Sequence, residues 1–253
     1  MIHLLGFQTS HNITFLIFFL FLMIYCVTIC GNLLIITLVS YSKTLHSPMY
    51  FFLSQLSVSD SLLANDILPI MLHAIFMKET ILSFSDCVSQ FYFFCVSEAS
   101  ECLLLTVMCY DRYLAICEPL HYTLAMNFRV CCFMITTCWA FSFLIVFIPT
   151  IRISHLEFCG PNIVDHFFCD LDPILQLSCS DTTIVLLEVT TMNFIFVLIP
   201  SRGQSWNISK YLSLLYTVVT PLMNPIIYSL RNKDLKKATA KIINQFLHLY
   251  YSK

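Results

Sequence analysis

Uncharged hydrophobic stretches alternate with short polar segments along the chain. A helix needs about 20 predominantly apolar residues to cross the ~30 Å hydrocarbon core of a bilayer. We predict spans at residues 15–39, 48–76, 87–113, 130–151, 183–200 and 211–230. The stretch 183–200 is marginal because it has only 18 residues and contains Glu188. The pattern predicts an all-α membrane protein with five or six membrane helices.

Composition supports this fold class. Hydrophobic residues make up 58% of the chain, charged residues only 11%, and the mean hydropathy is +0.80. Soluble domains carry about 25% charged residues. We therefore expect a multi-pass membrane protein in contact with the lipid bilayer, and no nucleic-acid partner.

The distribution of positive charge fixes an expected orientation. Lysine and arginine collect in cytoplasmic loops and tails. Residues 231–253 form a basic tail, which we expect to be cytoplasmic and to form a short surface helix. Six full crossings from an outside N-terminus would leave that tail outside. We therefore predict that residues 183–200 do not cross fully, so that Asn207 of the Asn-Ile-Ser sequon is lumenal and open to glycosylation. A second sequon, at Asn12, lies next to the first span.

Several polar groups interrupt the spans. Asn32 needs a hydrogen-bond partner at its depth, and a helix–helix contact is the simplest one. The second span contains Asp60 and Asp66, and the third contains Glu98 and Glu101, which are three residues apart and share one helix face. Intramembrane carboxylates usually face the bundle interior. They are consistent with a structural and gating hub, an ion pathway, or simple hydrogen-bonded burial.

Four cysteines are expected on one side of the membrane. The loop at residues 152–182 is acidic and contains Cys159, Cys169 and Cys179, and Cys87 opens the third span on the same face. Disulfides persist on the non-cytoplasmic side, and four thiols allow three pairings. Zinc is a weaker interpretation because the spacing contains no CxxC pair.

Three motifs resemble those of one family. Residues 108–122 read Met-Cys-Tyr-Asp-Arg-Tyr-Leu-Ala-Ile-Cys-Glu-Pro-Leu-His-Tyr, residues 45–60 begin Leu-His-Ser-Pro-Met-Tyr, and residues 220–228 read Thr-Pro-Leu-Met-Asn-Pro-Ile-Ile-Tyr. They are similar to the ends of the third, second and seventh helices of the odorant (olfactory) receptors among the rhodopsin-like G-protein-coupled receptors. The likeness runs from Leu4 to about Lys237, apart from one gap.

The resemblance implies roles for particular residues. It implies the disulfides Cys87–Cys169 and Cys159–Cys179, and a polar hub of Asn32, Asp60, Glu101 and Asn224 that could hold a sodium ion. An outer-half pocket for small odorants would include Phe94, Cys95, Glu98 and Ala99. The switch that meets a heterotrimeric G protein would comprise Asp111, Arg112, Tyr113, Pro225 and Tyr228. The carboxylate of Glu98 departs from the pattern and could select an amine or another hydrogen-bond donor.

The same comparison exposes a gap after Pro200. In the family the fifth span continues inward and is followed by a basic inner loop and a sixth span, so roughly 50 to 60 residues are absent here. The implied function is odorant detection at the plasma membrane. A truncated, non-signalling remnant, retained in the endoplasmic reticulum or pairing with other receptors, is the main alternative. The intramembrane carboxylates keep a transporter or channel open, whereas no phosphate loop, nucleophile elbow or His-Glu-x-x-His zinc motif indicates an enzyme.

Overall fold

Long parallel and antiparallel helices dominate the structure. The computed structural model describes residues 1–5, 10–42, 45–159, 163–164, 166–197, 218–226 and 237. The long helices are α1 (His11–Tyr41), α2 (Pro48–Met77), α3 (Phe84–Cys117) and α5 (Phe128–Ser154). The shorter ones are α4 (Tyr122–Ala125), α6 (Leu171–Gln176) and α7 (Thr183–Val197), and residues 218–226 are also helical.

Local sequence signals account for where these helices begin and end. Pro48 stands at the first turn of α2, where its missing N–H costs nothing. The side chains of Ser83 and Asn127 accept hydrogen bonds from the amides of Asp86 and Val130, which cap α3 and α5. Helix α3 ends at Cys117, two residues before Pro119, because proline cannot continue a helix unchanged.

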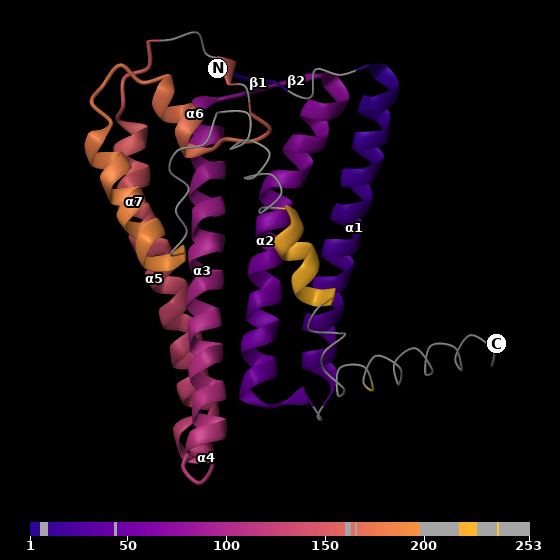
Figure 1. Ribbon diagram of the computed structural model, residues 1–253, viewed down its shortest axis with the longest axis vertical. Coiled ribbons are helices and arrows are strands. Elements are labelled where there is room, and N and C mark those ends of the chain that lie inside the picture. The colour runs from indigo at the N-terminus through magenta and orange to yellow at the C-terminus, as the bar shows by residue number, and fades with distance from the viewer. Residues whose placement is uncertain are drawn as a thin grey trace, which may run out of the picture.

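The helices pack side by side in a regular order. Helix α1 packs on α2, α2 on α3, α3 on α5, and α5 on α7. Figure 1 shows the helix of residues 218–226 lying against α1 and α2, which is where a seventh span would close the bundle. The disulfides and the N-terminus lie at one end, called here the outer end, and α4 lies at the inner end.

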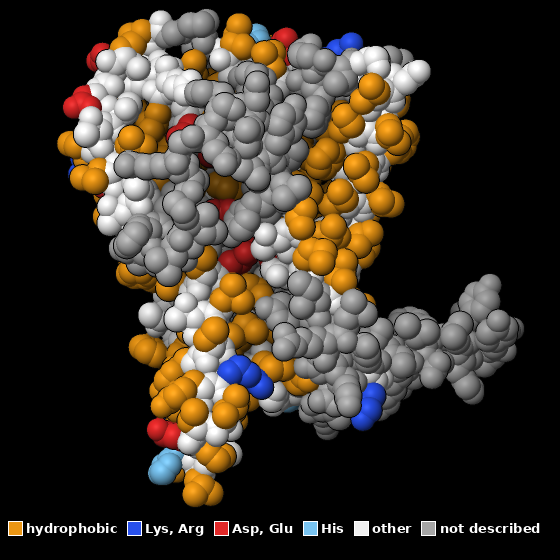
Figure 2. All heavy atoms as spheres, viewed as in Figure 1, with side chains coloured by type: hydrophobic (Ala, Val, Ile, Leu, Met, Phe, Trp, Pro, Cys, Tyr) orange, Lys and Arg blue, Asp and Glu red, His pale blue; other side chains and the backbone are white. Residues whose placement is uncertain are grey.

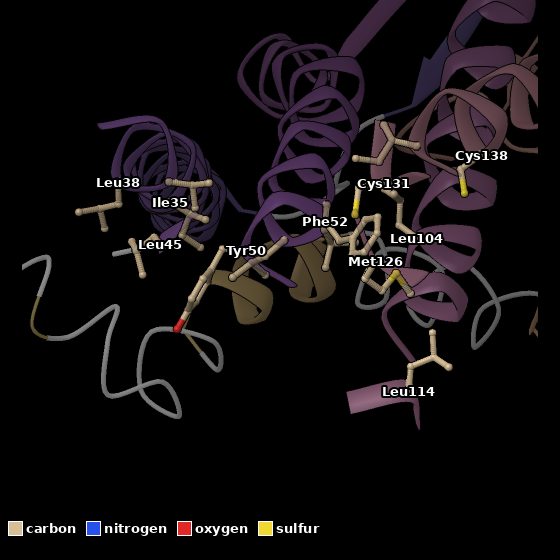
Figure 3. Close-up of a cluster of buried hydrophobic side chains, with 14 residues drawn as sticks. Ile35, Leu38, Leu45, Tyr50, Phe52, Leu104, Leu114, Met126, Cys131 and Cys138 are labelled. Atoms are coloured by element: carbon tan, nitrogen blue, oxygen red, sulfur yellow. The ribbon is translucent and has the colours of Figure 1, made fainter. Parts of the chain in front are cut away.

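Two hydrophobic clusters hold the bundle together. The inner cluster joins α1, α2, α3 and α5 through residues that include Ile35, Phe52, Leu104 and Cys138 (Figure 3). The outer cluster joins α2 and α3 to Phe167 and Phe168 of the loop before α6. Many large apolar side chains on α1 and α5 remain exposed, and Figure 2 shows them covering the visible side of α1. Lipid would cover these surfaces, because a membrane span is apolar on its outer face as well.

A small sheet covers the outer end, and the sequence did not predict it. Strand β1 (Ile2–Leu5) lies between β2 (Glu79–Leu82), to which it is antiparallel, and β3 (Ile163–Val164), to which it is parallel. Ile2 and Leu4 are buried against Cys87 and Cys169. The N-terminal strand thus joins two outer loops over the end of α3.

Helices α1, α2, α3 and α5 contain the apolar runs at residues 15–39, 48–76, 87–113 and 130–151. In the described part of the chain, α1, α2, α3 and α5 are the four helices that are long and apolar enough to cross a membrane. The 15 described residues of α7 measure about 22 Å, which is shorter than the hydrocarbon core. The predicted cytoplasmic tail falls outside the described residues, apart from Lys237.

Candidate functional site

Asp60 and Asn224 form the centre of a buried polar hub. The amide nitrogen of Asn224 donates to both carboxylate oxygens of Asp60, each at 3.1 Å, across 164 residues of sequence. Asp60 is fully buried on α2, in the middle of the bundle. A buried carboxylate is tolerated when its oxygens accept hydrogen bonds. This pair therefore fixes the last described helix against α2.

The other two predicted hub residues surround this pair. Asn32 on α1 is fully buried and donates to the carbonyl oxygens of Thr28, at 3.1 Å, and Pro221, at 3.3 Å. This is the helix–helix hydrogen bond expected of an intramembrane amide. Gly31 allows the close approach, since a Cβ atom built there would lie 3.3 Å from Cβ of Pro225.

Glu101 on α3 completes the hub. Its carboxyl group is in hydrogen-bond contact with that of Asp60. Its Oε1 is buried without a hydrogen-bond partner among the described residues. Two carboxyl groups in contact need a proton or a cation between them to offset their repulsion. A proton shared by the Asp60 and Glu101 carboxyl groups would meet this need, whereas the amide nitrogen of Asn224 already faces both oxygens of Asp60.

The four residues predicted to line the odorant pocket are in the outer half of α3. They pack against different parts of the structure. Phe94 packs against Phe168 with ring centroids 5.6 Å apart. Ala99 packs with Val146 of α5 instead. Cys95 borders both groups of side chains. The stretch thus lies between α2, α5 and the outer loop that follows α5.

Acidic side chains from three elements lie within electrostatic range of Cys95. Asp66 of α2, Glu98 of α3 and Asp170, which caps α6, all interact electrostatically with this cysteine. Glu98 also lies within electrostatic range of Glu101. Within the described ranges, no ion pair with lysine or arginine joins Asp66, Glu98 or Glu101. Three acidic side chains from different elements thus lie within electrostatic range of one cysteine of α3.

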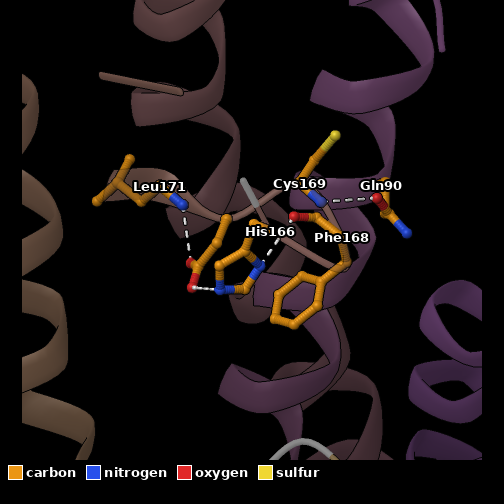
Figure 4. A network of polar contacts seen from close by, with 6 residues as sticks. Gln90, His166, Phe168, Cys169 and Leu171 are labelled. Atoms are coloured by element: carbon orange, nitrogen blue, oxygen red, sulfur yellow. Dashed lines mark hydrogen bonds and ion pairs between the residues drawn. The ribbon is translucent and has the colours of Figure 1, made fainter. Parts of the chain in front are cut away.

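A hydrogen-bond network holds the outer loop over this region (Figure 4). The side chain of Gln90 accepts from the amide of Cys169 at 3.0 Å and donates to the carbonyl oxygen of Asp66, also at 3.0 Å. The buried imidazole of His166 contacts the carbonyl oxygen of Phe168 at 3.1 Å and the carboxylate of Asp170 at 3.8 Å. The loop is thus fixed to α2 and α3 by side chains as well as by a disulfide.

Burial changes the acidity of one carboxyl group in this loop. Desolvation raises the pKa of Asp172 above its ordinary value, and the negative charge of Asp170 raises it further. The nearby His166 acts in the opposite direction. The loop thus retains a carboxyl group that binds a proton more readily than an exposed aspartate does.

Both disulfides implied by the resemblance are present in the structure. Cys87, at the start of α3, is bonded to Cys169, and Cys159 is bonded to Cys179. The first bond ties the outer loop to α3 beneath the three-stranded sheet. The second closes a hairpin in which Phe158 and Ser178 are bridged.

At the inner end, Asp111 is fully buried and its carboxylate has two donors. Arg112 donates to Oδ2 and the hydroxyl of Tyr122 donates to Oδ1, both at 2.8 Å. Tyr113 is exposed. Pro225 lies against Gly31, near the hub, and Tyr228 falls outside the described residues. The structure therefore shows the Asp111–Arg112 pair but not its relation to Tyr228.

Sequence reasoning missed three contacts. The first is the hydrogen bond from Tyr122 to Asp111, since the sequence shows Tyr122 only as part of a motif. The second is the pair of hydrogen bonds made by Gln90, because a lone glutamine at a helix start is common and carries no signal. The third contact is the ion pair between Arg152 and Glu188, which are 3.0 Å apart. Glu188 is thus neutralised near the outer end of α7. Its charge is therefore a weaker reason for an incomplete crossing than the sequence suggested.

The structure describes one of the two predicted glycosylation sites. Asn12 is exposed in the first turn of α1, and Thr14 of its sequon is buried and bonded to the carbonyl oxygen of Ser10. Asn207 falls outside the described residues.

A cavity of about 510 Å³ opens at the inner end between α1, α2 and α5, and none of the predicted pocket residues lines it.

Comparison with known proteins establishes the family. The profile of the 7 transmembrane receptor (rhodopsin family) matches residues 31–206. Human Olfactory receptor 11L1 is 38% identical to the chain, covering 98% of this chain and 94% of the relative. Mouse Olfactory receptor 1M1 is 37% identical, covering 96% and 94%. The chain belongs to the olfactory receptors of the rhodopsin family. It is therefore a multi-pass membrane receptor of a G-protein-coupled class and not an enzyme.

The alignment with this human olfactory receptor also measures the gap. It runs over 301 positions, although the chain has 253 residues, so at least 48 positions of the relative have no counterpart here. Human Olfactory receptor 2A12, 34% identical, aligns over 292 positions, which is at least 39 more than the chain has residues. A segment of this size corresponds to about one span with its connecting loops.

Proposed function

We propose that this olfactory receptor binds small odorants that carry an amine, in the outer half of its bundle. The observation that supports this is the group of three carboxylates, Asp66, Glu98 and Asp170, around Cys95. They come from α2, α3 and the start of α6, so they converge from different elements. No lysine or arginine pairs with Asp66 or Glu98 among the described residues.

The three carboxylates differ in the hydrogen-bond and charged partners that they already have. Oδ2 of Asp66 is buried without a hydrogen-bond partner in the described part of the chain. Asp170 accepts a hydrogen bond from the amide of Leu171 and lies 3.8 Å from the imidazole of His166, so it already has partners within the outer loop. Glu98 lies on α3 between Cys95 and Glu101 and is the best placed to meet an ammonium group. Apolar burial against Phe94 and Phe168 would supply the remaining affinity.

G-protein signalling would require a longer form of the receptor that contains the sixth span. In this family the element that relays ligand binding to a G protein includes the sixth span, which falls in the gap. A ligand can shift a receptor between two states only if a bistable element distinguishes them. We therefore propose ligand binding for the chain itself, and G-protein coupling for the chain with the absent positions restored from Olfactory receptor 11L1.

The test compares an alkylamine with the alcohol of the same carbon skeleton, using second-messenger output from the restored receptor. Glu98→Gln should raise the amine concentration needed for half-maximal response at least about tenfold, because it removes a charge partner in a low-dielectric site. The response to the alcohol should change little. Asp86→Asn, which alters an exposed outer carboxylate, is the matched control. An unchanged amine response in Glu98→Gln would exclude this assignment.

A further inference from the structure

The cavity of about 510 Å³ at the inner end extends over about half the thickness of a membrane. Its lining runs from Leu45, in the loop before α2, to Val58 of α2. Pro48 and Val58 are ten residues apart, which is about 15 Å along a helix axis, whereas the hydrocarbon core is ~30 Å thick. Figure 3 labels Leu45 and Cys131 of this lining, on the two sides of α2. The cavity is therefore about one lipid leaflet deep.

The cavity lies on the face of α2 that is turned toward lipid. Phe51, Gln55 and Val58 line it and are spaced four and three residues apart, so they share one side of the helix. The next residue on that side is Leu62, which is 50% exposed. Asp60 of the hub is two residues from Val58 and lies on the opposite side of α2. A molecule would thus enter the cavity from the bilayer and not from the interior of the bundle.

Hydrogen-bond donors interrupt an otherwise apolar lining. The amide oxygen of Gln55 accepts a hydrogen bond from Nε1 of Trp139 at 3.3 Å, and its amide nitrogen makes no hydrogen bond to another described residue. Ser47 precedes α2 without capping it through its side chain, and His46 is exposed next to it. Both residues lie where the lining begins. The cavity therefore suits a molecule with an apolar body and a polar head at the inner end.

The inner mouth of the cavity is positively charged. Helices α2 and α5 both begin there, at Pro48 and Phe128, which line the cavity. A helix N-terminus carries about half a positive charge, and neither helix has an acidic residue in its first turn. Arg129 is exposed in the first turn of α5 and forms no ion pair with a described residue. No aspartate or glutamate occurs among the described residues that line the cavity, so its mouth favours an anion.

We propose that this cavity binds an anionic phospholipid of the cytoplasmic leaflet, with an acyl chain between α1, α2 and α5 and the phosphate at the inner mouth. The disulfides place the outer end in an oxidising compartment, so the opposite end faces the cytosol. The cytoplasmic leaflet contains anionic lipids, and basic pockets between membrane helices on that side bind their head groups. The inference concerns the inner end and does not rest on the amine preference proposed above.

The experiment uses the whole chain in bilayers of phosphatidylcholine that contain a fixed minor fraction of phosphatidylserine. Trp206→Phe leaves Trp139, which is bonded to the lining residue Gln55, as the single tryptophan. Bromine on an acyl chain quenches the fluorescence of a nearby tryptophan. In one sample the phosphatidylserine is brominated, and in the other an equal amount of the phosphatidylcholine is. We expect brominated phosphatidylserine to quench Trp139 at about fivefold lower concentration, the preference that one basic residue gives at an anionic surface.

Two variants in this background separate the head group from the acyl chain. Arg129→Gln removes the charge at the mouth and should abolish the preference for phosphatidylserine, whereas Lys237→Gln removes an exposed charge that does not line the cavity and should retain it. Val58→Phe fills the cavity and should reduce quenching by brominated phosphatidylserine. Leu62→Phe enlarges an exposed residue beyond the lining and is its matched control.

Three results would overturn the proposal. The first is equal quenching by the two brominated lipids in the Trp206→Phe chain. The second is a preference for phosphatidylserine that survives in Arg129→Gln, which decides the question even if Val58→Phe does not fold. The third is relief of quenching when a sterol is added at a constant fraction of brominated phosphatidylserine, because a sterol would then be the occupant.

Discussion

The hydroxyl of Tyr122 donates a 2.8 Å hydrogen bond to Asp111, and Arg112 holds the other oxygen of the same carboxylate. The three residues connect the end of α3 to α4 in the inner loop. Asp111 is fully buried, so its charge depends on these two donors. The loop and the Asp-Arg motif therefore act as one unit in this chain.

This contact makes the inner end sensitive to alkaline pH. Burial and the bond to Asp111 raise the pKa of Tyr122 from 10.0 to about 12. Because the folded-state pKa is above the unfolded value, the stabilisation is complete below pH 10 and is lost as the pH rises toward about 12. A difference titration of tyrosine absorbance, wild type minus Tyr122→Phe, should show one group with a midpoint near the upper value. A difference midpoint near the ordinary value would mean that the bond is absent.

Loss of the Asn224 side-chain amide should lower the stability of the folded protein. Asn224→Ala leaves both oxygens of the buried Asp60 without that donor, which costs about 1–3 kcal/mol. We expect a lower melting temperature in detergent. Met223→Ala, on an exposed neighbour, is the matched control and should change the melting temperature much less. Equal melting of the two variants would show that Asn224 does not hold the last helix.

The two disulfides should differ in their effect on stability. Their cysteines are 82 and 20 residues apart, and the chain-entropy model gives about 4.5 and about 3 kcal/mol for loops of such length. Cys87→Ser should therefore lower the melting temperature more than Cys159→Ser. Cys169→Ser should match Cys87→Ser, and combining those two should add little. An additive effect of that pair would indicate that the cysteines act separately.

The position of the gap leads to a test of topology. If residues 183–200 do not cross fully, Asn207 lies on the lumenal side and can carry a sugar. Glycosidase treatment should then shift the mobility of the wild type, and Asn207→Gln should abolish the shift. Asn12→Gln is the companion variant, because the other sequon starts within α1 and Thr14 is buried there. A cytoplasmic tail with an unmodified Asn207 would contradict five crossings.

Much of the fold could be predicted from local patterns. Long apolar runs located the four long helices, and Pro48 and Pro119 marked the start of α2 and the end of α3. The three-stranded sheet could not be found in this way. Strand β1 has four residues and its partners are far away in the sequence, so no periodicity identifies it.

The contacts within the candidate site were harder to predict from local patterns than the helices were. Spacing alone placed Glu98 and Glu101 on one face of α3, but it could not connect Asp60 with Asn224, which is 164 residues away. Only the resemblance brought those two residues together. The pairing of Arg152 with Glu188 had no motif and depends on how α7 packs on α5. Long-range polar contacts of this kind depend on tertiary packing, which a local pattern does not encode.

The central claim is that the last helix keeps its place beside α1 and α2 although the chain lacks the sixth span. It is tested most directly by cysteines at Gly31 and Pro225, where a Cβ on Gly31 would lie 3.3 Å from that of Pro225, close to the ~3.8 Å of a disulfide. A protease site between Gly203 and Gln204 lets the two parts of the chain separate after cleavage. We predict that mild oxidation keeps the parts joined in the Gly31→Cys/Pro225→Cys variant and not in a Gly31→Cys/Met223→Cys control. Parts that separate in both variants without reductant would contradict the account.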